Sequence, residues 1–232
     1  MDVTHTLPPH ALQTRQSPLH ARLAPLASEW REANAYQVVT RVGHALHGEQ
    51  PWLADLSHCA RIGFKGRGSA GWLAAQGVKL PAAPNQWLRD TSGAVVARLG
   101  AQDFLIADDF DIDSGLPQRL AALAAGAAHA GAYLVPRQHG LAMLALGGKA
   151  APQWLARLCA VDLDGPAFGA ETIAQTQVAL VSTIVMRGAS PGPPGYRLLV
   201  DTSLALYLWD VLHEVAAALG GAVVGEAQIP RV

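Results

Sequence analysis

Gly66-Arg67-Gly68-Ser69-Ala70-Gly71-Trp72-Leu73 is the stretch that decides the fold, because a second version of it follows later in the chain. That version reads Gly148-Lys149-Ala150-Ala151-Pro152-Gln153-Trp154-Leu155. One offset of 82 residues (148 − 66 and 154 − 72) superimposes the glycine and the Trp-Leu pair. In both versions a predicted strand precedes the glycine and an apolar helical pattern follows it. The repeat therefore predicts one strand-turn-helix corner built twice, with each tryptophan filling a helix–sheet interface.

The periodicity around each version predicts the same series of elements. For the first copy we expect strands at 56–65, 86–89, 94–99, 103–107 and 132–135, with helices at 69–76, capped by Ser69, and at 116–128. For the second copy we expect strands at 140–147, 176–186, 196–201 and 222–225, with helices at 151–160 and at about 204–219. Each series indicates a β-α-β-β-α-β (split βαβ) unit, in which two helices cover one face of an antiparallel sheet.

The predicted fold class is therefore α+β, with two tandem split βαβ units in one compact pseudo-duplicated domain. Residues 1–52 are predicted to form an N-terminal arm, a helix and a strand, and the units span 53–136 and 137–232. The N-terminal helix should begin at Ser17-Pro18 and present Leu19, Leu23, Leu26 and Trp30 on one face. A strand at 36–42 should follow it.

The composition excludes several classes of protein. Half of the 232 residues are apolar, 15% are charged and the net charge is −1, which excludes general disorder and leaves no basic footprint for nucleic acid. No segment is long and apolar enough to span a membrane, and the first 16 residues lack the apolar core of a secretory signal. The two cysteines, Cys59 and Cys159, are far apart in the sequence and form no Cys-x-x-Cys motif. We therefore expect a soluble cytoplasmic protein without nucleic-acid or membrane partners.

Several residue groups suggest chemistry, but none has the spacing of a known site. His44, His47 and Glu49 offer metal ligands without a third fixed partner. His58 and Cys59 are adjacent on a predicted strand, where their side chains would point to opposite faces. Gly66-x-Gly68 lacks the rest of a phosphate loop, and the acidic run 108–113 lacks the glycine and glutamate of a calcium loop, so we interpret it as a solvated loop that caps a helix. The sequence predicts no catalytic, cofactor-binding or metal-binding residue on this chain.

The motifs resemble those of the aminomethyltransferase (glycine cleavage T-protein) and folate-binding superfamily. In the first half the resemblance rests on Asp55-Leu56-Ser57-His58, Ile62-Gly63-Phe64-Lys65-Gly66 and Ala70-Gly71-Trp72-Leu73. The second half resembles the sarcosine oxidase gamma subunit family through residues 144–150, 155–163, 168–169, 174–176, 196–200 and 203–208. Together with Ser17-Pro18-Leu19, the similarity covers about residues 17–218. It implies a T-protein-like folate-binding-domain fold, here without the C-terminal barrel of the transferases.

The sequence departs from the catalytic members of that superfamily. They carry an aspartate after a Gly-Gly hairpin and an acidic Gly-Glu-Asp-Gly-Phe-Glu segment. Here the hairpin reads Ser92-Gly93-Ala94-Val95-Val96 and has no carboxylate. The other segment runs from Ser190 to Arg197, and the positive charge of Arg197 has the wrong sign for recognising the amino-pterin donors of a folate. The resemblance therefore implies a noncatalytic gamma-type subunit of a heterotetrameric complex that oxidatively demethylates sarcosine or a related N-methyl amine.

In such a complex the alpha, beta and delta subunits would be the partners and would carry FAD, FMN and NAD. The alternative is a stand-alone folate-binding protein or a degenerate aminomethyltransferase-like protein. It would hold tetrahydrofolate between the two halves, with Trp87, Arg98, Tyr196 or Arg197 on the wall. Without any partner, the chain would be a homodimer.

Overall fold

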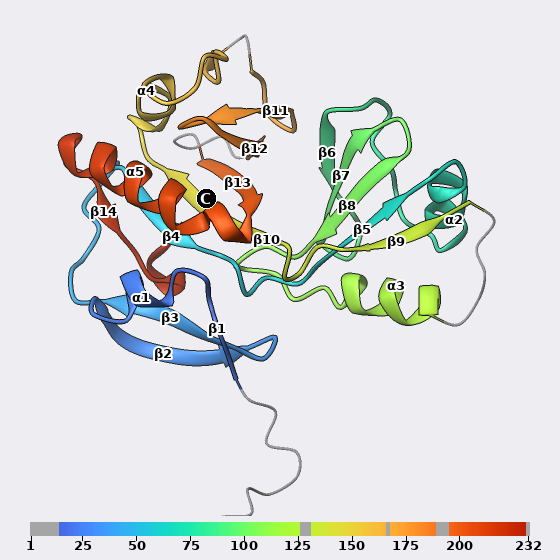
Figure 1. Ribbon diagram of the computed structural model, residues 1–232, viewed down its shortest axis with the longest axis horizontal. Coiled ribbons are helices and arrows are strands. Elements are labelled where there is room, and N and C mark those ends of the chain that lie inside the picture. The colour runs from blue at the N-terminus through green and yellow to red at the C-terminus, as the bar shows by residue number, and fades with distance from the viewer. Residues whose placement is uncertain (1–13, 126–130, 166–167, 189–194, 231–232) are drawn as a thin grey trace, which may run out of the picture.

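The computed structural model describes residues 14–125, 131–165, 168–188 and 195–230. Within these residues the strands form three sheets and the fold is mixed α+β, as predicted (Figure 1). A small N-terminal sheet has the strand order β1-β3-β2 and consists of β1 (Arg15–Gln16), β2 (Ala27–Ala33) and β3 (Tyr36–Val42). One-turn helix α1 (His20–Leu23) lies between β1 and β2. No helix among the described residues has the length and hydrophobicity needed to cross a bilayer.

Two larger sheets contain most of the remaining elements. The first has the order β6-β7-β8-β5-β9 and its neighbouring strands are antiparallel. Its elements are β5 (Arg61–Lys65), α2 (Ser69–Ala75), β6 (Gln86–Arg89), β7 (Val95–Gly100), β8 (Asp103–Ala107), α3 (Leu116–Ala125) and β9 (Tyr133–Pro136). We call it the 61–136 sheet.

The second large sheet has the order β11-β12-β13-β10-β4-β14. Its elements are β4 (Trp52–Asp55), β10 (Leu141–Gly147), α4 (Ala151–Ala156), β11 (Ile173–Val178), β12 (Val181–Arg187), β13 (Gly195–Asp201), α5 (Ala205–Ala218) and β14 (Ala222–Val223). We call this six-stranded sheet, together with its helices, the 141–223 sheet. A single turn of 3-10 helix, η2 (Thr202–Leu204), precedes α5, and another, η3 (Glu226–Gln228), follows β14.

The repeated corner has the same geometry in both units. Gly66 and Gly148 both have positive φ (113° and 103°), and they directly follow β5 and β10. The amide of Ser69 donates to the Gly66 carbonyl at 2.9 Å, and the amide of Ala151, 82 residues later, donates to the Gly148 carbonyl at 3.0 Å. A Cβ on Gly148 would lie 2.6 Å from the Gln50 carbonyl oxygen, so this turn requires glycine. The prediction of a twin strand-turn-helix corner is confirmed.

The strand beside the corner comes from the same unit in the 61–136 sheet, but from the N-terminal part of the chain in the 141–223 sheet. In the 61–136 sheet, Tyr133 of β9 pairs with Lys65 of β5. In the 141–223 sheet, the equivalent partner of Gly147 in β10 is Trp52 of β4, and not a residue of C-terminal β14, which pairs outside β4. The predicted boundary at residue 53 therefore does not coincide with a sheet boundary, because β4 lies in the sheet formed mainly by residues 141–223.

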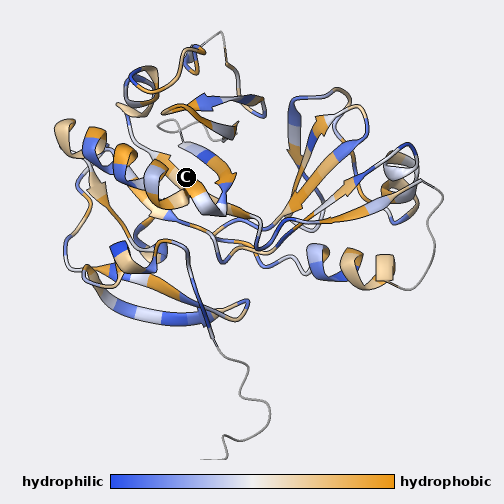
Figure 2. Ribbon diagram, viewed as in Figure 1, coloured by the Kyte–Doolittle hydropathy of each residue, from blue (hydrophilic) through white to orange (hydrophobic). Residues whose placement is uncertain are grey.

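The two large sheets pack face to face, with helices on their outer faces. Side chains from both sheets share one buried cluster, in which Met143 and Ala145 meet Ala97 and Leu105. Alternate residues of β10, such as Leu144, point into a second cluster. Because β10 is buried on both faces, it appears as a continuous apolar run (Figure 2).

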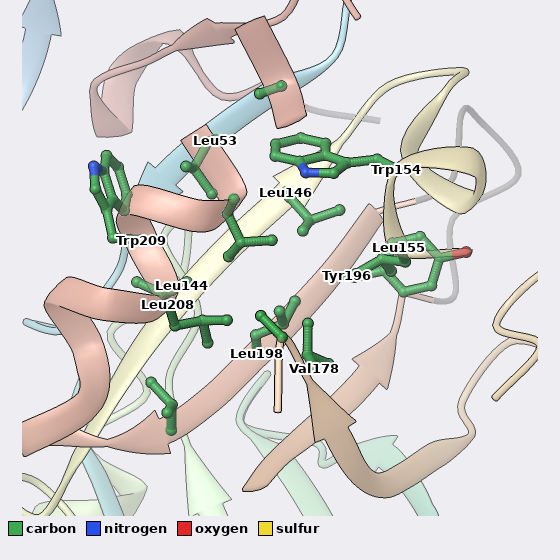
Figure 3. Close-up of a cluster of buried hydrophobic side chains, with 14 of the residues drawn as sticks. Leu53, Leu144, Leu146, Trp154, Leu155, Val178, Tyr196, Leu198, Leu208 and Trp209 are labelled. Atoms are coloured by element: carbon green, nitrogen blue, oxygen red, sulfur yellow. The ribbon is translucent and has the colours of Figure 1, made fainter. Parts of the chain in front are cut away.

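The outer clusters hold the helices against the sheets. Trp154 of α4 and Trp209 of α5 lie with Tyr196 in the cluster that covers the 141–223 sheet (Figure 3). On the 61–136 sheet, Trp72 is half-buried and stacks on Phe64 with ring centroids 4.7 Å apart. The predicted core role is thus confirmed for Trp154, whereas Trp72 lies at the margin of its core.

Four element predictions were wrong. The N-terminal helix continues only to Leu23, and β2 replaces its second half, because Asn34 and Ala35 (φ 49° and 60°) form a two-residue hairpin turn. The predicted strand 176–186 is also a hairpin, turning at Ala179 and Leu180. The predicted strand 56–65 is limited to β5. Gly68, not Ser69, occupies the N-cap of α2.

Some predictions fall partly outside the described residues. These are the N-terminal arm, the end of the 116–128 helix, the segment from Ser190 to Arg197 and the end of the second unit.

Candidate functional site

The two large sheets are joined by two crossing segments, and several buried polar side chains lie in or beside them. Residues 56–60 connect β4 to β5, and residues 137–140 connect β9 to β10. The two segments are hydrogen-bonded to each other, since Gln138 Oε1 accepts from the Arg61 amide at 2.8 Å and its Nε2 donates to the Ser57 carbonyl. Both connections between the two large sheets therefore lie at one place, which we call the crossing (Figure 1).

Arg61 fastens this crossing. Its guanidinium is buried and donates to four backbone carbonyls, those of Ser57, Cys59, Gln138 and Leu141. The first two carbonyls belong to one crossing segment, and the others belong to the second segment and the start of β10. Burial lowers the pKa of Arg61 from its usual value, and its Nε has no hydrogen-bond partner among the described residues. A single charged side chain thus holds both crossing segments.

Next to the crossing lies a cavity of about 370 Å³ with an acidic wall. It is enclosed by β2, the 56–60 segment, the loop after β8 and the C-terminal turn η3. Its lining residues are Arg31, Glu32, Ala33, Asn34, His58, Cys59, Asp108, Asp109, Phe110, Asp111, Ile112, Asp113 and Glu226. We call it the acidic cavity.

Glu226 is the first buried carboxylate of the acidic cavity. Arg31 donates to both of its oxygens, at 2.5 and 2.6 Å, and His58 Nε2 lies 3.2 Å from Oε1. Burial alone would raise the pKa of Glu226, but the hydrogen bonds from His58 and Arg31 outweigh it and lower the pKa to about 2. Glu226 is therefore an anion that ties the C-terminal turn to β2 and to the crossing.

Asp109 is the second buried carboxylate. Arg197 Nε donates to it at 2.9 Å and Arg89 at 3.1 Å, so that it connects β6 and β13 across the two sheets. Burial opposes ionisation, but the charges and hydrogen bonds of Arg197 and Arg89 prevail and lower the pKa of Asp109. The Arg197 guanidinium also lies 5.3 Å from the ring centroid of Phe110.

The acidic run was predicted to be a solvated helix cap, and this is wrong for its first two residues. Asp108 and Asp109 are buried, and the hydroxyl of Ser114 accepts the amide of Leu116 at the start of α3. Burial raises the pKa of Asp108, and hydrogen bonds from Ser114 act in the opposite direction. No sequence signal separates Asp109 from Asp111 and Asp113, because its partners Arg89 and Arg197 are distant in sequence.

His58 and Cys59 also differ from the prediction. They lie in the crossing segment, not on a strand, so both side chains are buried on the same side, with Nε2 and Sγ 3.7 Å apart. Burial and the negative charge of Asp109 raise the pKa of Cys59 well above its usual value. The thiol is therefore protonated at neutral pH and is a poor nucleophile.

The four residues proposed as a folate-binding wall do not converge. Trp87 donates through Nε1 to the Arg187 carbonyl, and the Tyr196 hydroxyl donates to the Leu163 carbonyl. Arg98 binds the carbonyls of residues 81, 82 and 101, while Arg197 is paired with Asp109. None of the four lines the acidic cavity. The structure assigns them to internal hydrogen bonds.

The other sequence candidates have structural roles. The Gly68 amide in the glycine turn donates to the Gly131 carbonyl at 2.9 Å, so it is used within the fold. Near His44 and His47, Glu49 Oε2 lies 3.8 Å from Lys149 Nζ. Across the described ranges, no three His, Cys, Asp or Glu side chains come together as a metal site. The acidic cavity contains two groups of ion pairs: those of Glu226 join β2 to η3 and the crossing, and those of Asp109 join the two large sheets.

Comparison with known proteins places this geometry in a wider context. No family model matches the chain. It is 29% identical over 174 residues to the sarcosine oxidase subunit gamma of Corynebacterium sp. (strain U-96), which covers 72% of this chain and 81% of that protein.

Two solved structures have a similar fold. The first is a chain of the heterotetrameric sarcosine oxidase from Corynebacterium sp. U-96, determined in complex with pyrrole 2-carboxylate. It superimposes with a TM-score of 0.67 at 23% identity, over 95% of this chain and 100% of that one. The second is glycine cleavage system aminomethyltransferase T from Bartonella henselae, with a TM-score of 0.67 at 16% identity, over 93% of this chain and 60% of that one. The resemblance that the motifs indicated is therefore confirmed: the chain is similar to a sarcosine oxidase gamma subunit, and its fold is similar to that of a sarcosine oxidase chain and of aminomethyltransferase T.

Proposed function

We propose that this chain is a noncatalytic gamma-type subunit of a heterotetrameric complex that oxidatively demethylates sarcosine or a related N-methyl amine. The observation that carries the proposal is the similarity to a sarcosine oxidase gamma subunit over 81% of that protein. The partners in this proposal are alpha, beta and delta subunits, which hold the FAD, FMN and NAD. The chain itself holds no cofactor in this proposal.

The chemistry of the crossing supports a noncatalytic role. A general base or a nucleophile needs a side chain that is free to exchange a proton or to attack. Glu226 and Asp109 are instead engaged by arginines, and burial keeps Cys59 as a thiol. This arrangement suits a rigid body that presents a fixed surface to other subunits.

Two finer points belong to the same proposal. The matching hydrogen bonds at an offset of 82 residues support an origin of both halves from one duplicated split βαβ unit. Both cysteines are free thiols, which suits a reducing compartment, so we propose that the complex works in the cytoplasm.

Co-expression followed by size-exclusion chromatography tests the proposal. The chain should elute with alpha, beta and delta subunits of a sarcosine oxidase, and the purified chain alone should not oxidise sarcosine. Calorimetry of the isolated chain with tetrahydrofolate is the companion measurement. Elution of the chain apart from the other subunits, together with micromolar folate binding, would overturn the proposal in favour of a stand-alone folate-binding protein.

A further inference from the structure

A second cavity, of about 340 Å³, adjoins the crossing and differs in charge from the acidic cavity. Arg15 of β1, Tyr36 of β3, and Ser57, Arg61 and His139 of the crossing lie in its wall. We call it the cationic cavity, because its wall contains two arginines and a histidine, and no aspartate or glutamate.

Within the described part of the chain, neither arginine of the cationic cavity forms an ion pair. Arg61 donates only to backbone carbonyls, and Arg15 takes part in no ion pair within the described part of the chain. Asp55 is nearby in sequence, but its carboxylate accepts from the Ser17 hydroxyl and the Ser57 amide. Arg61 is buried and already donates to four carbonyls, whereas Arg15 is exposed and has no carboxylate partner among the described residues, so Arg15 is the group that can receive an anion.

Neutral hydrogen-bonding groups surround these charges. The Tyr36 hydroxyl lies 2.9 Å from His139 Nδ1, and Ser57 Oγ accepts from the Met143 amide at 3.2 Å, which leaves its own proton available for donation. Burial lowers the pKa of His139, and the charges of Arg15 and Arg61 lower it further. The two arginines therefore create a positive potential at the same place.

We propose that the cationic cavity binds a small organic carboxylate. The guanidinium of Arg15 has no ion pair with the described residues and can donate two parallel hydrogen bonds to one carboxylate. The hydroxyls of Tyr36 and Ser57 would be further donors to the ligand. Leu141 and Pro18 provide an apolar wall for the organic part of the ligand. A free phosphate dianion shares the oxyanion chemistry but leaves this apolar wall unused.

Isothermal titration of the full-length chain with benzoate tests the proposal, with inorganic phosphate and neutral benzamide as the comparison ligands. The expected dissociation constant for benzoate is on the order of 1 mM, as suits a fragment with one ion pair. Arg15→Gln should weaken benzoate binding at least tenfold, and Arg15→Lys should restore part of it. Arg41→Gln, which removes an exposed arginine of β3 outside the cavity, should change nothing.

A nuclear magnetic resonance titration of His139 provides a second readout. Bound benzoate should raise the pKa of His139 in the wild type and not in Arg15→Gln. Equal loss of binding in Arg15→Gln and Arg41→Gln would overturn the proposal, because it would reveal only a general salt effect. Tighter binding of phosphate than of benzoate, or binding of benzamide as tight as that of benzoate, would also refute the carboxylate assignment.

Discussion

Replacing Arg61 with leucine tests whether one side chain holds the two sheets together. The substitution keeps the apolar stem but deletes the donors to four carbonyls. All four carbonyls lose a charged partner, and the Ser57 carbonyl keeps the neutral donor from Gln138. Each unsatisfied buried carbonyl costs about 1–3 kcal/mol, and water from the adjoining cavity can reduce this cost. We expect a loss of about 3–5 kcal/mol in the free energy of unfolding.

Urea denaturation and thermal melting measure this loss. For a chain of this size, about 3–5 kcal/mol corresponds to a melting temperature lowered by roughly 6–20 °C. Arg61→Lys should be intermediate, because an ammonium keeps the charge but cannot reach four acceptors. Arg119→Leu, at an exposed arginine of α3, is the matched control and should stay within about 0.5 kcal/mol of the wild type. If Arg61→Leu loses no more than this control, the crossing is not held by Arg61.

Three further predictions concern other parts of the molecule. Gly148→Ala should lower the free energy of unfolding in urea by about 2–4 kcal/mol, because the added Cβ would lie 2.6 Å from a carbonyl oxygen. Gly77→Ala, at a positive φ but in open space, should lower it by only about 1 kcal/mol. Equal losses would contradict this steric argument. The folded-state pKa of Glu226 lies below its ordinary 4.5, so its ionisation stabilises the fold above about pH 4.5, and this contribution is lost as the pH falls towards 2. After allowance for solvent screening, the stability difference between the wild type and Glu226→Gln should be about 1–2 kcal/mol at pH 6 and should shrink by pH 3; a difference that grows on acidification would refute the sign. Cys59 and Cys159 are both buried, so Ellman's reagent should titrate neither thiol quickly in the native chain and both in urea; rapid native labelling would contradict their burial.

The repeated corner was predictable because it depends on local chemistry. A glycine at positive φ followed directly by a helix gives a recognisable residue pattern, and its repetition 82 residues later allowed the pattern to be identified. Strand β8 and the hairpin of β6 and β7 were also predicted almost to the residue, since turn residues separate short apolar runs.

The hairpin turns in β2–β3 and β11–β12 were missed for a different reason. Ala35, Ala179 and Leu180 have positive φ although none of them is a glycine. Residue type therefore gave little warning of either turn. The helical spacing of Leu19, Leu23 and Trp30 was misleading, because strand pairing with β3 overrides that period.

The position of β4 in the 141–223 sheet could not be predicted from local patterns. Trp52 belongs to the strand that precedes β5 in the chain, and only tertiary pairing shows that it flanks Gly147 of β10 and not a strand of the 61–136 sheet. The same holds for the ion pairs of the candidate site. Glu226 meets Arg31, 195 residues away in the chain, and the sequence contains no local mark of that contact.

Native mass spectrometry tests the central claim most directly. Alpha, beta and delta subunits of a sarcosine oxidase are expressed with and without this chain, and the mass and the rate of sarcosine oxidation are recorded for each preparation. We expect one copy of this chain in each complex, and loss of the assembled complex and of its activity when the chain is omitted. A complete, active complex of the other three subunits that does not bind this chain would contradict the account.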